Sequence, residues 1–159
     1  MRARIVFHHG CLRELYHTGR GRPGRCASQL RKTKERRRGC KVMAIIKANA
    51  YGHGLVGVAT ALPDADAFLV ARIDEASALR RAGVKNRVLL LEGVTTAADL
   101  LQAVQNDFDC VINNSSQLTM LGILRSQSTS RIWLKFDSGM NRLGFRCEFA
   151  SQASHRLAL

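Results

Sequence analysis

Short apolar runs alternate with longer mixed segments from Lys41 onward. The runs are typical of buried strands and cover Val42–Ile46, Ala67–Ala71, Val88–Leu91, Cys110–Asn113 and Arg131–Phe136. The segments between them predict helices over His53–Leu62, Asp74–Ala82, Thr95–Gln105 and Ser115–Leu124. The sequence thus predicts strands separated by single helices, with Cys147–Leu159 beginning a further helix.

Strands that are apolar throughout and are separated by single helices indicate a parallel sheet covered on both faces. An open doubly wound sheet and a (β/α)8 barrel both fit this pattern. Polar or charged residues end nearly every strand, namely Lys47, Arg72, Glu92, Asn113 and Asp137. In a barrel these strand ends form the active-site face, which modestly favours the barrel. The predicted strands are too few to close an eight-stranded barrel, so either the sheet is open or the chain is incomplete.

Two predicted helices begin with residue types that suit a helix N-terminus. Asp74 and Glu75 lie where the helix dipole favours negative charge, and Gly83 closes the same helix. Either Asn114 or Ser115 caps the helix that follows the fourth strand.

Composition allows one ordinary globular domain, because the chain has 159 residues and 46% of them are hydrophobic. No apolar run approaches the ~18 residues that span a bilayer, and the N-terminus lacks the apolar core of a signal peptide. The Arg-rich start is typical of a transit peptide but has no amphipathic stripe, so we expect a soluble, cytoplasmic protein. Cysteines are odd in number and widely spaced, which predicts neither a disulfide scaffold nor a metal site: Cys11, Cys26, Cys40, Cys110 and Cys147.

The net charge of +13 is concentrated at the N-terminus. Residues 1–40 hold 12 of the 25 Lys and Arg residues but only Glu14 and Glu35 among the 12 acids. Such an arm could bind phosphate backbones, but Arg31–Arg38 has no interleaved aromatic residues and no recognisable binding fold. We therefore read residues 1–40 as an irregular, solvated or disordered segment and do not expect a nucleic-acid partner.

Four ordered blocks resemble the N-terminal barrel domain of alanine racemases. They read KANAYGHG at 47–54, LPDADAF at 62–68, LLLEG at 89–93 and LKFDSGMNRLG at 134–144. The resemblance covers about two thirds of the chain, from Lys41 to Arg146. It implies that residues 41–159 are a partial (β/α)8 barrel containing about the first half of its βα units.

The family resemblance also implies a pyridoxal 5'-phosphate enzyme that interconverts L-alanine and D-alanine through a Schiff base. Lys47 matches the family's catalytic lysine, which binds the cofactor aldehyde and acts as one of the two bases that racemisation needs. By itself, a lysine at a strand end could equally reach into solvent. In the family, such enzymes are homodimers that supply D-alanine for the cell wall.

Three further residues match positions of known role in the family. Tyr51 matches the tyrosine whose hydroxyl binds the cofactor phosphate, although it could also be a half-buried loop aromatic. Arg142 matches the arginine that contacts the cofactor phenolic oxygen and the substrate carboxylate, a task suited to its fork of donors. Lys135 matches a supporting lysine that family members often carbamylate, which turns the cation into an anion that can hold the arginine in place. Without the modification, Lys135 would repel Arg142. Around them, Gly52 and Gly54 predict a turn, and Asn49 and His53 are expected to organise the loop.

The resemblance stops at both ends of the chain. Family members carry a strand and a helix before the lysine block, whereas residues 1–40 show no such pattern. We hypothesise that they are a wrong-frame translation joined to the true frame near Gly39 or Cys40. The later strands and the second base, a tyrosine of another domain, have no match, so we expect the fragment to be inactive alone. The alternatives are a noncatalytic pyridoxal-phosphate-binding module and a basic-arm nucleic-acid-binding protein.

Overall fold

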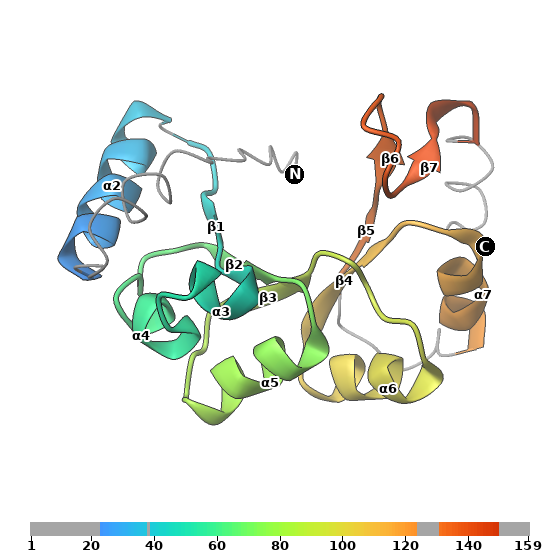
Figure 1. Ribbon diagram of the computed structural model, residues 1–159, viewed down its shortest axis with the longest axis horizontal. Coiled ribbons are helices and arrows are strands. Elements are labelled where there is room, and N and C mark those ends of the chain that lie inside the picture. Colours follow the sequence, from blue (N-terminus) through green and yellow to red (C-terminus); the bar gives the residue numbers. More distant parts are fainter. Residues whose placement is uncertain (1–22, 38, 124–130, 150–159) are drawn as a thin grey trace. The chain divides into compact units, whose positions relative to one another are not determined.

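The computed structural model describes residues 23–37, 39–123 and 131–149 (Figure 1). Its elements are, in order, α2 (Pro23–Arg36), β1 (Met43–Ile45), α3 (Lys47–Tyr51), α4 (Leu55–Thr60), β2 (Ala67–Val70), α5 (Ile73–Arg81), β3 (Arg87–Leu90), α6 (Ala97–Gln105), β4 (Phe108–Ile112), α7 (Ser115–Ile123), β5 (Ile132–Leu134), β6 (Phe136–Asp137), β7 (Phe145–Arg146) and the 3-10 turn η1 (Cys147–Phe149). A five-stranded sheet has the order β1-β2-β3-β4-β5, and β6 pairs with β7. The predicted α/β class and strand sequence are confirmed.

The chain divides into two compact units, which are described separately below. Among the described residues, the first unit holds those up to Val70 together with Asp74–Val88. The second holds Ala71–Ile73 and the residues from Leu89 onward. The division therefore falls inside β3.

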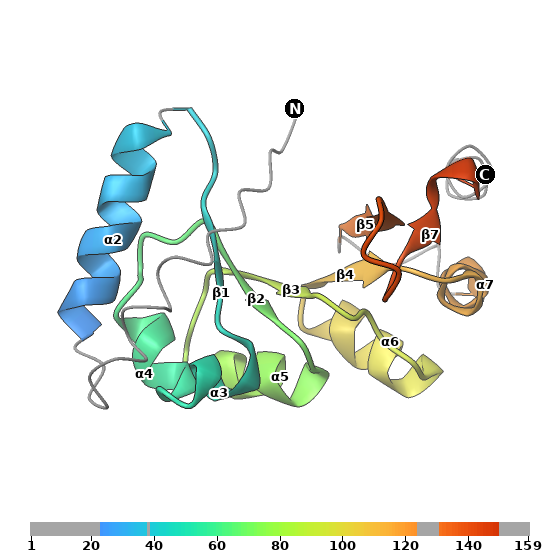
Figure 2. The same cartoon turned by 45° about the horizontal axis from the view of Figure 1, so that its top comes forward.

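In the first unit, β1 and β2 pair in parallel, with Met43 opposite Ala67 and Ile45 opposite Leu69. All four residues of β2 are buried, as its uninterrupted apolar sequence predicts. Helices α4 and α5 lie on the same side of β1 and β2 (Figure 2). Their apolar residues Leu55, Val58, Ala76 and Leu79 are buried. Removal of this apolar surface from water is the main stabilising contribution to the unit.

Helix α2 lies within the segment where the sequence predicts no regular structure. Its apolar residues Cys26 and Leu30 are four positions apart and buried, and the helix contacts α4. Arg and Lys are good helix formers, so a strongly basic segment still folds once one face can pack. The expectation of an irregular segment thus does not hold for Pro23–Arg36, while residues 1–22 lie outside the described part of the chain. No helix of the described part is long and apolar enough to cross a membrane.

In the second unit, β4 and β5 pair in parallel, with Cys110 opposite Ile132 and Ile112 opposite Leu134. All of β4 is buried, including the charged residue Asp109, which is 4% exposed. The Asp109 carboxylate accepts hydrogen bonds from the Arg131 main-chain N–H at 3.2 Å and from the Trp133 indole N–H at 3.4 Å. A buried carboxylate needs such partners, so these bonds help to fix β5 against β4.

Side chains at two helix starts act as caps. The main-chain N–H of Gln117 donates to Asn114 Oδ1 at 3.0 Å, which identifies Asn114 rather than Ser115 as the cap of α7. At α6, the Thr96 hydroxyl oxygen accepts from the Asp99 N–H at 3.1 Å. Both bonds satisfy donors that a helix leaves unpaired in its first turn.

The predicted strand Arg131–Phe136 is divided in the structure, because β5 ends at Leu134 and β6 begins at Phe136. Lys135 lies between them: its N–H donates to the Ile112 carbonyl and its own carbonyl accepts from the Phe145 N–H, both at 2.9 Å. Lys135 thus bonds to β4 through one main-chain group and to β7 through the other. Strands as short as β6 and β7 leave no periodic pattern, so the sequence did not predict them.

Candidate active site

Lys47 lies at the end of the first strand, as the sequence predicts, with one residue between it and the last position of β1. Ile46 precedes it and is buried, and its main-chain N–H donates to the Leu69 carbonyl at 2.9 Å, which continues the β1–β2 ladder by one residue. Lys47 itself is half-buried and begins α3. The lysine therefore projects from a fixed strand end rather than from a freely moving loop.

The residues after Lys47 form a left-handed helical turn. Ala48, Asn49, Ala50 and Tyr51 all have φ between 52° and 54°. The turn is closed by hydrogen bonds from Ala50 N–H to the Ile46 carbonyl at 2.8 Å and from Gly52 N–H to the Ala48 carbonyl at 3.1 Å. Each L-residue in this conformation costs about 1–2 kcal/mol, so surrounding contacts must compensate. Such strain is common at functional sites.

Asn49 organises this turn, as the sequence predicts. Its side-chain Oδ1 accepts from the Leu55 N–H at 2.8 Å, and its carbonyl accepts from the Gly54 N–H at 3.1 Å. Its own main-chain N–H donates to Glu75 Oε1 at 3.0 Å. Glu75 was expected only to suit the dipole of α5, and no sequence signal connects it to a residue 26 positions earlier.

The turn carries Lys47 at one end and Tyr51 at the other. Both side chains are half-buried, and Ala50 between them is fully buried and anchors the turn. Pyridoxal 5'-phosphate has an aldehyde that reacts with a primary amine and a phosphate that accepts hydrogen bonds. An amine and a phenol hydroxyl held on one short turn fit these two groups.

Lys135 and Arg142 belong to the second unit, whereas Lys47 and Tyr51 belong to the first. Lys135 is half-buried, and Arg142 is exposed in the loop that joins β6 to β7. That loop returns beside Lys135, since Gly144 lies so close that a Cβ atom there would be 3.2 Å from the Lys135 carbonyl oxygen. The structure thus brings Lys135 to the base of the loop that carries Arg142.

The carboxylate of Asp137 organises the same loop. It accepts a hydrogen bond from the Gly139 N–H at 2.9 Å. Main-chain N–H groups of the loop, first that of Gly139 and then that of Asn141, lower the pKa of Asp137 below its usual value. The sequence marked Asp137 only as a polar strand end, although an aspartate two residues before a glycine is a recognisable turn signal.

Two other polar residues that end strands or follow them have structural partners. Asn113 Nδ2 donates to the Glu92 carbonyl at 2.9 Å. Gln117 Nε2 donates to the same carbonyl at 3.0 Å and to that of Val94 at 3.1 Å. Asn113 and Gln117 are buried, so their amides fix the turn after β3.

Five strands that alternate with helices, with a half-buried lysine just after the first strand, fit part of an unclosed (β/α)8-barrel domain. The family model described as "Alanine racemase, N-terminal domain" matches residues 23–159. The chain belongs to the alanine racemase family. The match begins within the Arg-rich segment, at the first residue of α2, and not at Lys41.

Curated relatives support the same family. An alanine racemase of Shewanella sediminis is 50% identical over 110 residues, which are 69% of this chain and 31% of that protein. One of Shewanella baltica is 51% identical over 117 residues, or 74% of this chain and 33% of its own length. The chain therefore spans about a third of the length of these relatives.

Solved structures agree with the fold. The alanine racemase of Acinetobacter baumannii superposes with a TM-score of 0.80 at 32% identity, covering 83% of this chain and 38% of that one. The biosynthetic alanine racemase of Pseudomonas aeruginosa superposes with a TM-score of 0.76 at 38% identity, and the match covers 86% of this chain and 38% of that one. The prediction of a partial, unclosed barrel of this family is confirmed.

Proposed function

We propose that this chain is the portion of an alanine racemase that binds pyridoxal 5'-phosphate covalently through Lys47 and supplies one of the two bases that interconvert L-alanine and D-alanine. The observation that carries the proposal is the left-handed turn that fixes Lys47 and Tyr51 at its two ends. Membership of the alanine racemase family supports the choice of substrate and cofactor.

Each site residue has a role in this proposal. When bound, the cofactor ring withdraws electrons and so acidifies the Cα proton of the attached amino acid. Lys47 would hold the cofactor aldehyde through its amine and, when that amine is free, would move a proton to or from one face of the substrate Cα. By the family resemblance, the Tyr51 hydroxyl would donate to the phosphate, and the Arg142 guanidinium would bind the phenolic oxygen and the substrate carboxylate. Lys135, when carbamylated, holds Arg142 in place.

Racemisation also needs a base on the opposite face of Cα. We assign only Lys47 as a base, and the chain spans about a third of its relatives' length. The 159 residues alone are therefore expected to bind cofactor without racemising alanine. In the complete enzyme we expect a cytoplasmic homodimer whose D-alanine serves cell-wall synthesis.

Reductive trapping tests the cofactor assignment. The purified chain is incubated with pyridoxal 5'-phosphate, reduced with borohydride, and mapped by peptide mass spectrometry. The phosphopyridoxyl group should lie on Lys47 and be absent from Lys47→Ala, while the exposed-lysine control Lys85→Ala keeps it. Label spread over exposed lysines without enrichment at Lys47 contradicts the proposal.

A chimera tests the racemase assignment and separates it from a noncatalytic cofactor-binding module. Residues 41–146 replace the equivalent segment of the Pseudomonas aeruginosa racemase, whose structure aligns with this chain. Turnover of L-alanine to D-alanine that is lost in Lys47→Ala is expected. A chimera that folds and carries the cofactor on Lys47 but lacks turnover favours the noncatalytic module.

A further inference from the structure

Glu75 contacts the turn of the candidate site without carrying any of its proposed chemistry. Its Oε1 atom accepts from the Asn49 main-chain N–H at 3.0 Å. We propose that Glu75 is a positioning residue that holds the left-handed turn in the conformation that presents Tyr51 to the cofactor phosphate. The inference rests on the proposed role of Tyr51.

The turn needs a partner outside itself. The first four N–H groups of any helix lack acceptors within the helix, and Asn49 N–H is one of these groups in α3. Each of the four residues with positive φ also costs about 1–2 kcal/mol, which favours relaxation of the turn if contacts are lost. A carboxylate is a strong acceptor for this orphan N–H because a charged partner makes a shorter and stronger hydrogen bond.

Glu75 is itself held firmly. It lies in the first turn of α5, and the residues Ala76 and Leu79 of this helix are buried. The turn by contrast buries only Ala50. Asn49 Oδ1 fixes the exit of the turn through Leu55 N–H, and Glu75, on a different element, accepts from the Asn49 N–H within the turn. A rigid helix thus sets the position of a strained segment.

The preference for phosphorylated cofactor reports this role. Pyridoxal shares the aldehyde with pyridoxal 5'-phosphate but lacks the phosphate. The intrinsic difference between the two ligands is the same for every variant, so a change in the ratio of their affinities at Lys47 reports the phosphate contact. Tyr51→Phe should lower that ratio directly. Glu75→Ala should lower it about tenfold through the turn, since hydrogen bonds to charged groups are among the stronger ones.

Matched variants isolate the hydrogen bond. Glu75→Gln keeps an acceptor oxygen and should retain most of the preference, and Asp74→Ala, which removes the exposed neighbouring acid of the same helical turn, should leave it unchanged. In the double variant Glu75→Ala with Tyr51→Phe, the preference for pyridoxal 5'-phosphate over pyridoxal should be only slightly lower than in Tyr51→Phe alone. If Glu75→Ala lowered the affinities for pyridoxal and pyridoxal 5'-phosphate by the same factor, the role of Glu75 would be merely structural and the inference would be overturned.

Hydrogen exchange tests Glu75 even if the chain forms no adduct at Lys47, an outcome that would refute the proposed function alone. The Asn49 amide of the chain without cofactor should exchange at least several-fold faster in Glu75→Ala than in the parent or in Asp74→Ala, because it loses its acceptor. Unchanged exchange at Asn49 would overturn the inference.

Discussion

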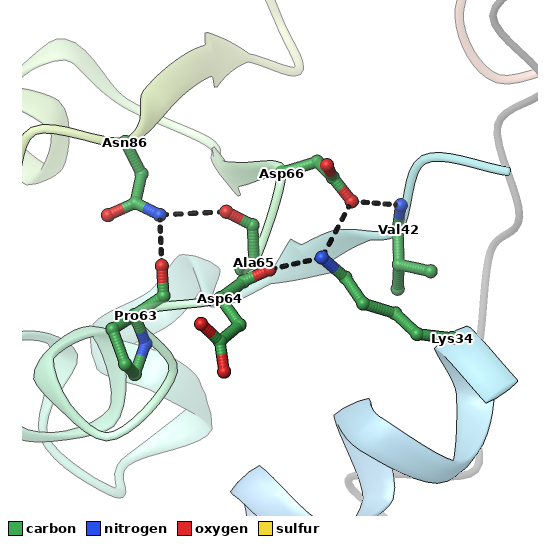
Figure 3. A network of polar contacts seen from close by, with 7 residues as sticks. All are labelled: Lys34, Val42, Pro63, Asp64, Ala65, Asp66 and Asn86. Atoms are coloured by element: carbon green, nitrogen blue, oxygen red, sulfur yellow. Dashed lines mark hydrogen bonds and ion pairs between the residues drawn. The ribbon is translucent and has the colours of Figure 1, made fainter. Parts of the chain in front are cut away.

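The Nζ atom of Lys34 lies 3.2 Å from Oδ2 of Asp66 and also donates to the carbonyl oxygen of Asp64 (Figure 3). The same Oδ2 atom accepts from the Val42 N–H at 2.7 Å. Asp66 therefore joins α2 to the start of β1 and to the segment that leads into β2. Lys34 belongs to the Arg-rich segment, whereas Asp66 belongs to a family block, so the two parts pack as one unit.

The Lys34 ion pair should contribute modestly to stability. Both side chains are about one third exposed, at 34% and 29%, so Lys34→Ala should lower the free energy of unfolding by only about 0.5–1 kcal/mol. Asp66→Ala should cost about 1–3 kcal/mol, because it also leaves the Val42 N–H without its acceptor. Urea unfolding measures both, with the exposed Lys32→Ala as control. A loss for Lys32→Ala equal to that for Lys34→Ala would count against a specific pair.

Gly93 should not tolerate alanine. Its φ is +70°, and a Cβ atom would lie 2.2 Å from the Val111 carbonyl oxygen. Gly83 has a similar φ of +80° but open space around it, so Gly83→Ala tests the conformational cost alone. Gly83→Ala should cost about 1 kcal/mol and Gly93→Ala clearly more, beyond about 3 kcal/mol, because the backbone must also move. Thermal unfolding of the two variants compares them, and equal losses would contradict the predicted clash.

Cys110 should be unreactive in the folded chain. Burial, together with the neighbouring carboxylate of Asp109, raises the pKa of its thiol from 9.0 to about 12. Iodoacetamide at pH 8 should label the half-buried Cys40 but not Cys110, which becomes reactive only in denaturant. Because only the unfolded thiol ionises above pH 9.0, stability should fall between pH 9.0 and about 12. Labelling of Cys110 at the rate of Cys40 would contradict its burial.

The Asp137 loop should respond to acid. The pKa of this carboxyl is lowered from 3.8 by main-chain hydrogen bonds, so its contribution to stability is present above pH 3.8 and is lost as the pH falls through the lower folded value. Amide resonances of Gly139 and Arg142 should shift together at that midpoint in an NMR titration. In Asp137→Asn this common step should disappear. Its persistence in the variant would assign the titration to another group.

The strand pattern could be predicted because burial on both faces of a parallel sheet leaves uninterrupted apolar runs. Ala67–Val70 and Phe108–Ile112 are such runs, and both lie fully buried where expected. Helix α2 could not be predicted in this way, because only Cys26 and Leu30 mark its buried face among many basic residues. Its packing partner, α4, lies well beyond any local sequence pattern.

The candidate site likewise has features that the sequence predicts and features that it does not. Lys47, Tyr51, Lys135 and Arg142 could be named from the sequence because their residue types occur in blocks that resemble one family. Their proposed roles remain predictions. The left-handed conformation between Lys47 and Tyr51 could not be named, because Ala and Tyr have no preference for positive φ.

The sequence by itself therefore determined the order of the five sheet strands and of the helices between them, the family, and the identity of the chemical groups at the strand ends. Those features depend on residue type and on spacing along the chain. Only the tertiary structure decided that Glu75 bonds to Asn49, that Asp137 organises the loop of Arg142, and that Lys34 pairs with Asp66. These contacts depend on where main-chain N–H groups and side-chain charges lie after packing. The spacing of apolar residues along the sequence does not predict those positions.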